Sequence, residues 1–165
     1  MSISTTYPLY AIAIGSNRRG RHGHPRAEVR AAIAALPNVL AVSRLIETAP
    51  VGPSLRRFTN AAVLLHSSET PPMMLARLKR IERDFGRRRG QRWSARVIDL
   101  DIVLWSGGAW RDATLCIPHI AFRTRNFVLH PLVQIAPRWR DPQTGRTIRQ
   151  LAMRLDMVDR TRIRS

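Results

Sequence analysis

Two aspartates, one residue apart, interrupt an apolar and largely β-branched stretch and are the residues best suited to chemistry. Val97–Leu104 has the composition of a strand, so Asp99 and Asp101 should project from one face with their Cα atoms roughly 6–7 Å apart. The opposite face is apolar and consists of Ile98, Leu100, Ile102 and Leu104. Because an ionised carboxylate is costly to bury without a partner, this pair requires a divalent cation or a group of arginines.

Arginines stand directly before the acid pair in the sequence: Arg87, Arg88, Arg89, Arg92 and Arg96. Guanidinium groups hold phosphate oxygens in pairs, and carboxylates with phosphates are typical ligands of Mg²⁺. The combination therefore favours the chemistry of a magnesium nucleotide. For the D-x-D pattern taken alone, structural salt bridges to these arginines are the alternative.

Length and composition predict one domain over residues 1–165, with residues 1–7 and 156–165 as flexible tails. The lone Cys116 excludes an intramolecular disulfide and fits a reducing compartment, so we expect a cytoplasmic location. No apolar run approaches the roughly 20 residues that a membrane span needs. The net charge of +17 (28 basic minus 11 acidic residues) favours anionic partners, although codon bias can also produce an excess of arginine.

The hydrophobic pattern predicts an α+β fold. Four strands are expected, at Leu9–Ile14, Val39–Glu47, Phe58–His66 and Val97–Trp105. Two helices are expected between them, one from Pro25 to Pro37 and one from Pro71 to Gly86. The order β-α-β-β-α-β is that of a ferredoxin-like antiparallel sheet. A C-terminal extension of turns and helices should follow, with helices at Asn126–Ile135 and Thr147–Leu155.

Several separated motifs together resemble a known family. They are R-W-S-A-R-V-I-D-L-D-I-V at 92–103, A-I-G-S-N at 13–17, F-T-N-A-A at 58–62, Pro118-His119 and R-N-F-V-L at 125–129. In this order they resemble the 6-hydroxymethyl-7,8-dihydropterin pyrophosphokinases of folate biosynthesis. The resemblance implies a ferredoxin-like core and transfer of pyrophosphate from ATP to the hydroxymethyl group of the pterin, giving the pterin diphosphate and AMP.

The resemblance also implies roles for individual residues. Asp99 and Asp101 match the ligands of two Mg²⁺ ions, and Arg87 and Arg96 match catalytic arginines that contact the triphosphate. The residues that match nucleotide contacts are Glu82, Arg89, Trp93, His119 and Arg125. Most of these have a structural alternative, such as a helix-surface salt bridge for Glu82 and a capping role for His119.

The same resemblance places a pterin pocket on other parts of the chain. Phe58 and Phe127 match an aromatic pair that stacks on the pterin ring, and Asn60 matches an amide that binds its edge. Thr48 and the backbone near Val51 complete this pocket. Without the resemblance, both phenylalanines would be read as core residues.

Three other interpretations remain open at this point. The charge and the ferredoxin-like frame suggest a nucleic-acid binder, but the strands lack the aromatic pattern of RNA-recognition domains and carry two aspartates. A metal-dependent nuclease or nucleotidyltransferase would explain the acid pair but not Phe58, Asn60 and Phe127. A family member that binds pterin without catalysis is the third. We expect a monomer with no membrane partner, and no metal at His22-x-His24, which has no evident third ligand.

Overall fold

The computed structural model describes residues 7–49, 56–86 and 97–164. Its centre is an antiparallel sheet with the strand order β2–β4–β1–β5, in which β3 also pairs with β4. The strands are β1 (Leu9–Ser16), β2 (Val39–Val42), β3 (Ile46–Thr48), β4 (Phe58–His66) and β5 (Asp99–Trp105). With β2 and β3 as two halves of one strand, the chain order and the spatial order confirm the predicted ferredoxin-like α+β fold.

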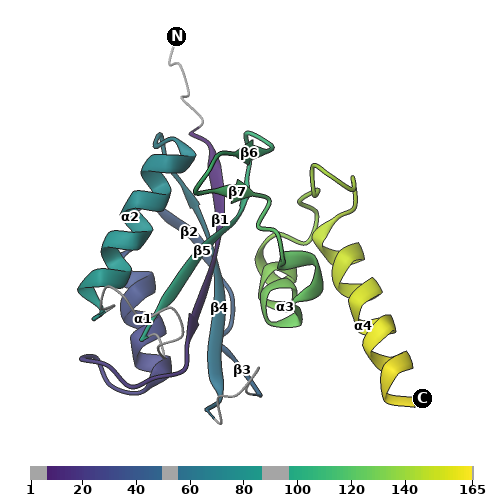
Figure 1. The fold of residues 1–165 in the computed structure, drawn as a ribbon, viewed down its shortest axis with the longest axis horizontal. Coiled ribbons are helices and arrows are strands. Elements are labelled where there is room, and N and C mark those ends of the chain that lie inside the picture. The colour runs from purple at the N-terminus through teal and green to yellow at the C-terminus, as the bar shows by residue number, and fades with distance from the viewer. Residues whose placement is uncertain (1–6, 50–55, 87–96, 165) are drawn as a thin grey trace.

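Two helices, α1 (Pro25–Ala35) and α2 (Pro71–Asp84), cover one face of the sheet (Figure 1). Each begins with a proline in its first turn, where the missing N–H would have no partner within the helix. Alternate strand residues such as Ile12, Ile14 and Leu100 face these helices and form one hydrophobic cluster with them. The alternation predicted for Val97–Leu104 therefore holds for Ile98, Leu100 and Ile102, whose side is the helix-covered side. It is wrong for Leu104, which packs on the other face because the register with β1 shifts between Ala11 and Ile12.

The other face is covered only in part. Helices α3 (Asn126–Ile135) and α4 (Ile148–Arg164) lie on this side, α3 against β4 and α4 outside α3 (Figure 1). A short 3₁₀ turn, Phe122–Thr124, leads into α3, and a small hairpin of β6 (Trp110–Arg111) and β7 (Cys116–Ile117) precedes it. Because α3 lies over β4, the start of β5 is not buried beneath these helices.

Two sequence-based expectations were wrong in their bounds. The strand expected at Val39–Glu47 is interrupted, and the gap is closed by Ser43, whose N–H donates to the carbonyl of Ala62 and whose hydroxyl accepts from the N–H of Ala62. The tail expected from residue 156 is helical to Arg164, because Asp156 and Asp159 bond to His130 and Asn126 of α3. Polar contacts with α3 thus hold the part of α4 that follows Leu155.

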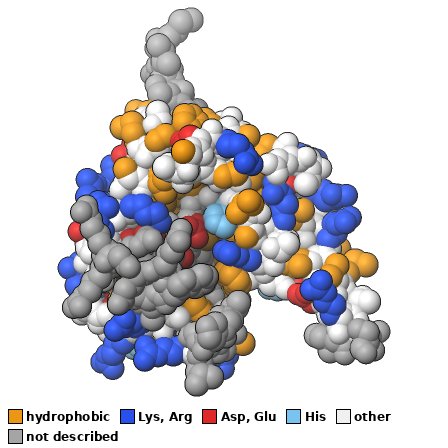
Figure 2. Space-filling view, in the orientation of Figure 1, with side chains coloured by type: hydrophobic (Ala, Val, Ile, Leu, Met, Phe, Trp, Pro, Cys, Tyr) orange, Lys and Arg blue, Asp and Glu red, His pale blue; other side chains and the backbone are white. Residues whose placement is uncertain are grey.

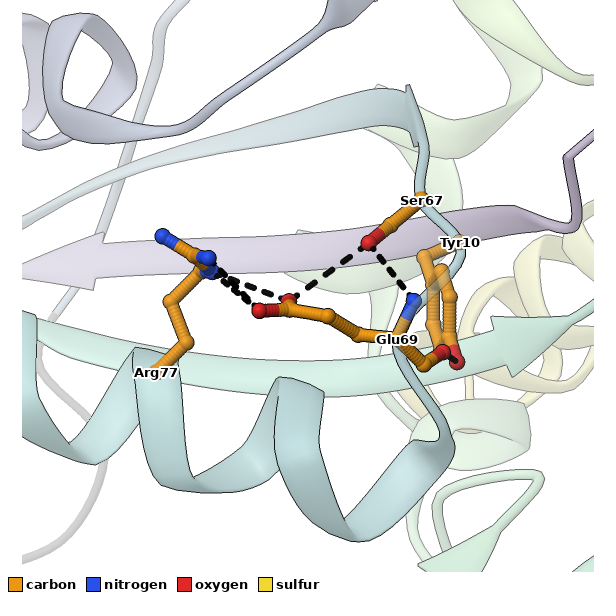
Figure 3. A network of polar contacts seen from close by, with 4 residues as sticks. All are labelled: Tyr10, Ser67, Glu69 and Arg77. Atoms are coloured by element: carbon orange, nitrogen blue, oxygen red, sulfur yellow. Dashed lines mark hydrogen bonds and ion pairs between the residues drawn. The ribbon is translucent and has the colours of Figure 1, made fainter.

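One end of the sheet is closed by a polar network between β1, β4 and α2 (Figure 3). The Arg77 guanidinium donates to Glu69 through Nε and a terminal nitrogen at 2.6–3.0 Å, and this bonding lowers the pKa of Glu69. The Tyr10 hydroxyl donates to the backbone carbonyl of Glu69, and the Ser67 hydroxyl accepts from its N–H. Charges at this end are thus neutralised within the fold. No helix in the described ranges is long and apolar enough to cross a membrane.

Candidate active site

The acid pair lies at the start of β5, on the face opposite α1 and α2. In the sheet register, Asp99 stands beside Gly15 of β1, and Gly15 stands beside Asn60 of β4. Asp101 is paired in the same way with Ala13. Because directly opposed residues of antiparallel strands project to the same side, the two carboxylates and the Asn60 amide share one face.

Small residues on β1 separate the acid pair from the amide. Ala11, Ala13 and Gly15 occupy the alternate positions of β1 that face this side. A Cβ at Gly15 would lie 3.1 Å from the Asn60 side-chain oxygen. The central strand therefore forms a floor of small residues between the acid pair and the amide. The sequence motifs did not predict this feature of the site. The alternation A-I-A-I-G at 11–15 was the available signal.

The predicted pterin-binding residues on β3 and β4 are neighbours in the structure. Thr48 pairs with Phe58 across the two strands, and the Asn60 amide donates to the Thr48 hydroxyl at 2.9 Å. Asn60 is buried, whereas Thr48 and Phe58 are half-buried. The hydrogen bond fixes the orientation of the amide, so that its oxygen is on the side of Gly15.

His119 reaches the acid pair from the segment that follows β7 and lies beside β5. Its backbone N–H donates to the Val103 carbonyl at 3.0 Å, which ties it to the strand. Its Nδ1 accepts the N–H of Ala121 at 3.2 Å, and its Nε2 lies 3.9 Å from an oxygen of Asp101. A neutral ring with Nδ1 as acceptor carries its proton on Nε2, toward Asp101. The ring thus both caps its own segment and faces the site.

The electrostatics of the pair set it apart from an ordinary surface carboxylate. Burial raises the pKa of Asp101, the negative charge of Asp99 raises it further, and His119 and Arg125 partly oppose this. Burial also lowers the pKa of His119, and the positive charge of Arg125 adds to this effect while Asp101 counteracts it. The charged form of Asp101 is therefore disfavoured by its surroundings.

Arg125 and Phe127 bring the start of α3 to the site. The Arg125 guanidinium lies 5.6 Å from the centre of the Phe127 ring, and both side chains are half-buried. Figure 2 shows acidic side chains beside a histidine near the centre of the view, with basic side chains nearby. The structure therefore brings Asp99, Asp101, His119 and Arg125 to one region of the surface.

Glu82 acts from the opposite side of β5. Its carboxylate is fully buried, accepts the N–H of Leu100 at 3.0 Å and pairs with Lys79 at 2.9 Å. Leu100 stands between the two site aspartates, so Glu82 fixes the backbone that carries them. The alternative of a helix salt bridge is confirmed by the pairing with Lys79, but it is not at the surface, because the Glu82 carboxylate is buried against the sheet. The predicted nucleotide contact of Glu82 stays a prediction.

Five predicted site residues lie outside the described residues: Val51, Arg87, Arg89, Trp93 and Arg96. Their predicted roles stay predictions.

The donor chemistry fits a hard divalent cation. Two carboxylates project from one strand face with mutual repulsion, which a cation would relieve, and carboxylate oxygen is the ligand that Mg²⁺ prefers. Within the described ranges there is no group of three or more His, Cys, Asp and Glu side chains arranged to hold a metal ion. A site of this kind takes its remaining ligands from water and phosphate.

The fold and these side chains define a ferredoxin-like domain with an acidic, oxygen-donor site on its partly covered sheet face. Over residues 11–137 the chain matches the 7,8-dihydro-6-hydroxymethylpterin-pyrophosphokinase family. The chain belongs to this family. The resemblance found in the sequence motifs is thereby confirmed.

Individual relatives agree. The chain is 42% identical over 105 residues to the 2-amino-4-hydroxy-6-hydroxymethyldihydropteridine pyrophosphokinase of Synechocystis sp., covering 64% of this chain and 54% of that protein. It is 37% identical over 146 residues to the Pseudomonas aeruginosa enzyme of the same name, covering 85% and 87%. The solved structure of wild-type Plasmodium falciparum HPPK-DHPS superposes with a TM-score of 0.71 at 14% identity, covering 93% of this chain and 45% of that one. The chain thus spans only about half of some relatives, and the last comparison supports the fold alone.

Proposed function

We propose that this chain transfers the pyrophosphoryl group of ATP to the hydroxymethyl oxygen of 6-hydroxymethyl-7,8-dihydropterin, with Mg²⁺ held by Asp99 and Asp101. The supporting observation is the shared sheet face, on which the acid pair and the Asn60 amide flank a floor of small residues. A flat ligand bound at Asn60 would have its substituent directed across Gly15 toward the carboxylates. Membership of the pyrophosphokinase family supports the same reaction.

In this reaction the pterin hydroxyl oxygen forms a bond to the β-phosphorus of ATP. The bond from that phosphorus to the bridging oxygen of the α-phosphate breaks, its electron pair leaves with AMP, and the hydroxyl proton is released. Such a transfer depends on positioning and on neutralising negative charge. Mg²⁺, when bound, supplies charge neutralisation and acidifies the hydroxyl.

The protein residues have distinct parts in this proposal. Asn60, oriented by Thr48, binds the pterin edge, and Phe58 and Phe127 stack on its ring. His119 and Arg125 place positive or donor groups beside the acid pair, where the phosphates would lie. Val51 is proposed for the pterin side.

The residues that lie outside the described ranges complete the nucleotide side of the proposal. Arg87 and Arg96 would contact the triphosphate as charge develops, and Arg89 and Trp93 would contact the nucleotide. The half-buried free thiol of Cys116 fits a reducing compartment, which supports a cytoplasmic location.

The open sheet face also bears on the rival interpretations. Two aspartates on that face would repel the phosphate backbone of a nucleic acid unless a metal neutralised them. A nuclease would need the acid pair but has no use for an amide held beside a half-buried phenylalanine. The geometry therefore favours a small heteroaromatic substrate.

The direct test is to incubate the protein with ATP, Mg²⁺ and the reduced pterin, and to separate the products. AMP and pterin diphosphate should form in equal amounts. Asp101→Asn should abolish both, whereas Asp156→Asn on α4, which breaks only a surface contact with His130, should not. Release of ADP in place of AMP would contradict pyrophosphoryl transfer. Pterin binding without any nucleotide turnover would indicate a binding protein.

A further inference from the structure

Glu28 is a fully buried carboxylate in the first turn of α1 to which no role has been assigned. One of its oxygens accepts the backbone N–H groups of His22 at 2.6 Å and Gly23 at 3.1 Å. The other lies 2.9 Å from Nδ1 of the His22 ring. The carboxylate thus organises the loop before α1 through three contacts in fixed directions.

The loop itself is a tight turn between two glycines. Gly20 and Gly23 bond to each other through both backbone groups, at 3.0 and 3.2 Å, and Gly23 has a φ of +124°. A Cβ at Gly20 would lie 2.4 Å from a methyl carbon of Val97 and 2.7 Å from the Glu28 carboxylate. Gly20 is therefore pressed between Glu28 and Val97 with no space for a side chain.

The turn also contacts the end of α2. The His22 ring lies 4.6 Å, centre to centre, from the ring of Phe85, and the Arg21 guanidinium lies 5.5 Å from the same ring. Phe85 directly follows α2, and Val97 stands two residues before Asp99. The turn Gly20–Gly23 thus contacts both the end of α2 and the approach to the acid pair.

The two residues that the turn contacts, Phe85 and Val97, stand close to either end of one segment of the sequence. The segment 87–96, which contains Arg87, Arg89 and Arg96, connects them. One small turn therefore contacts the chain on either side of the predicted phosphate-binding arginines. A buried carboxylate is a costly way to hold a loop, because it must be desolvated, but its bonds are directional where apolar packing is not.

We propose that Glu28 is a positioning residue, which acts through His22 and the turn Gly20–Gly23 to fix the start of β5 relative to the end of α2. This inference rests on the function proposed above, since it assigns Glu28 to the placement of Asp99. Displacements of about 1 Å in such groups cost about 100-fold in rate for reactions that depend on positioning. Glu28 contacts neither substrate in this account.

The test is Glu28→Gln, with Glu69→Gln as the matched control at the opposite end of the sheet. The glutamine keeps the size of Glu28 but loses the charge. The Glu28→Gln substitution should lower kcat at least tenfold, while the KM for the pterin changes less than twofold. Glu69→Gln breaks the pairing with Arg77, and so it should lower Tm but leave kcat unchanged. His22→Ala, at a partly exposed ring, should lower kcat in the same direction by a smaller factor.

Amide hydrogen exchange gives a readout that does not depend on activity. In Glu28→Gln, exchange at Val97–Leu100 and at Phe85–Gly86 should accelerate at least tenfold, with no change at Tyr10 or Glu69. A normal kcat in Glu28→Gln and His22→Ala, or exchange at Val97–Leu100 that stays as in the wild type, would overturn the role of Glu28. If the wild-type protein forms no product, the proposed function fails, and the exchange result still decides whether Glu28 fixes the start of β5.

Discussion

Asp141 and Asp101 lie in the same small domain, yet their surroundings shift their pKa values in opposite directions. Burial alone would raise the pKa of Asp141, but hydrogen bonds from Arg123, Thr144 and the backbone of Gln143 lower it to about 2. Arg123 makes two of these bonds, at 2.6 and 2.8 Å. For Asp101, burial and the charge of Asp99 raise the pKa, and its nearest contact with the His119 ring is long, at 3.9 Å.

This difference in surroundings distinguishes carboxylates that stabilise the fold from carboxylates suited to binding a ligand. Asp141 closes the turn before α4, and Glu69 closes the far end of the sheet with Arg77. Both are matched by an arginine of the fold itself. Asp101 instead has another acid as its close neighbour, an arrangement that costs stability and is typical of sites that bind cations.

The comparison predicts its largest effect for Asp101→Asn. The turnover number should fall about 10³-fold, because one of the two carboxylates proposed to hold Mg²⁺ is lost. Tm should stay the same or rise, because the substitution also removes repulsion with Asp99. Parallel measurements of AMP formation and thermal unfolding check this. Substantial residual turnover, or a loss of stability, would place Asp101 with the structural carboxylates.

Asp141→Asn should show the reverse pattern. Removing one partner of a buried, bidentate pair leaves Arg123 without its acceptor and should lower the free energy of unfolding by about 3 kcal/mol. Turnover per folded molecule should not change, because Asp141 is far from the acid pair in the fold. Urea unfolding and active-site titration provide the two numbers. Normal stability would refute the assigned role of Asp141.

Acid should remove part of the same stabilisation. The pKa of Asp141 is about 2 in the folded protein, below the ordinary value of 3.8, so folding favours its ionised form. This contribution is fully present above pH 4, is lost as the pH falls toward 2, and amounts to about 2 kcal/mol. Urea midpoints measured between pH 5 and pH 2 should therefore converge for the wild type and Asp141→Asn. Curves that stay parallel would contradict the assignment.

A smaller effect is expected on the pterin side of the site. Thr48→Val removes the acceptor of the Asn60 amide while keeping the shape of the side chain. Loss of one such bond costs about 1 kcal/mol, so pterin affinity should fall roughly fivefold. The turnover number at saturating pterin should remain normal. Calorimetry with the pterin measures this, and unchanged affinity would separate Thr48 from the pocket.

The sequence predicts the fold well because the strands and helices of the sheet domain obey local patterns. The bounds of Phe58–His66 and Asn126–Ile135 match those of β4 and α3, even though α3 contains Pro131. The acid pair and its shared face follow from the period of a strand alone. The helical continuation after Asp156 could not be predicted, because it depends on polar contacts with α3.

The rest of the site depends on strand register and on distant contacts. Nothing local in the sequence places Gly15 between Asp99 and Asn60, since that order is set by pairing across three strands with a bulge at Ala11 and Ile12. Glu28 was missed for a related reason. An acidic residue in the first turn of a helix is common at the surface, so its type and position gave no sign of burial.

The central claim is that the acid pair is a binding site for a metal–nucleotide complex, and it can be measured directly. Tm should be recorded for the wild type, Asp101→Asn and the control Asp156→Asn, each with Mg²⁺ and a non-hydrolysable ATP analogue. At about 100 times the dissociation constant, the ligand should stabilise the wild type and Asp156→Asn by about 2.7 kcal/mol. The account predicts no comparable rise in the Tm of Asp101→Asn. An equal rise in all three proteins would contradict it.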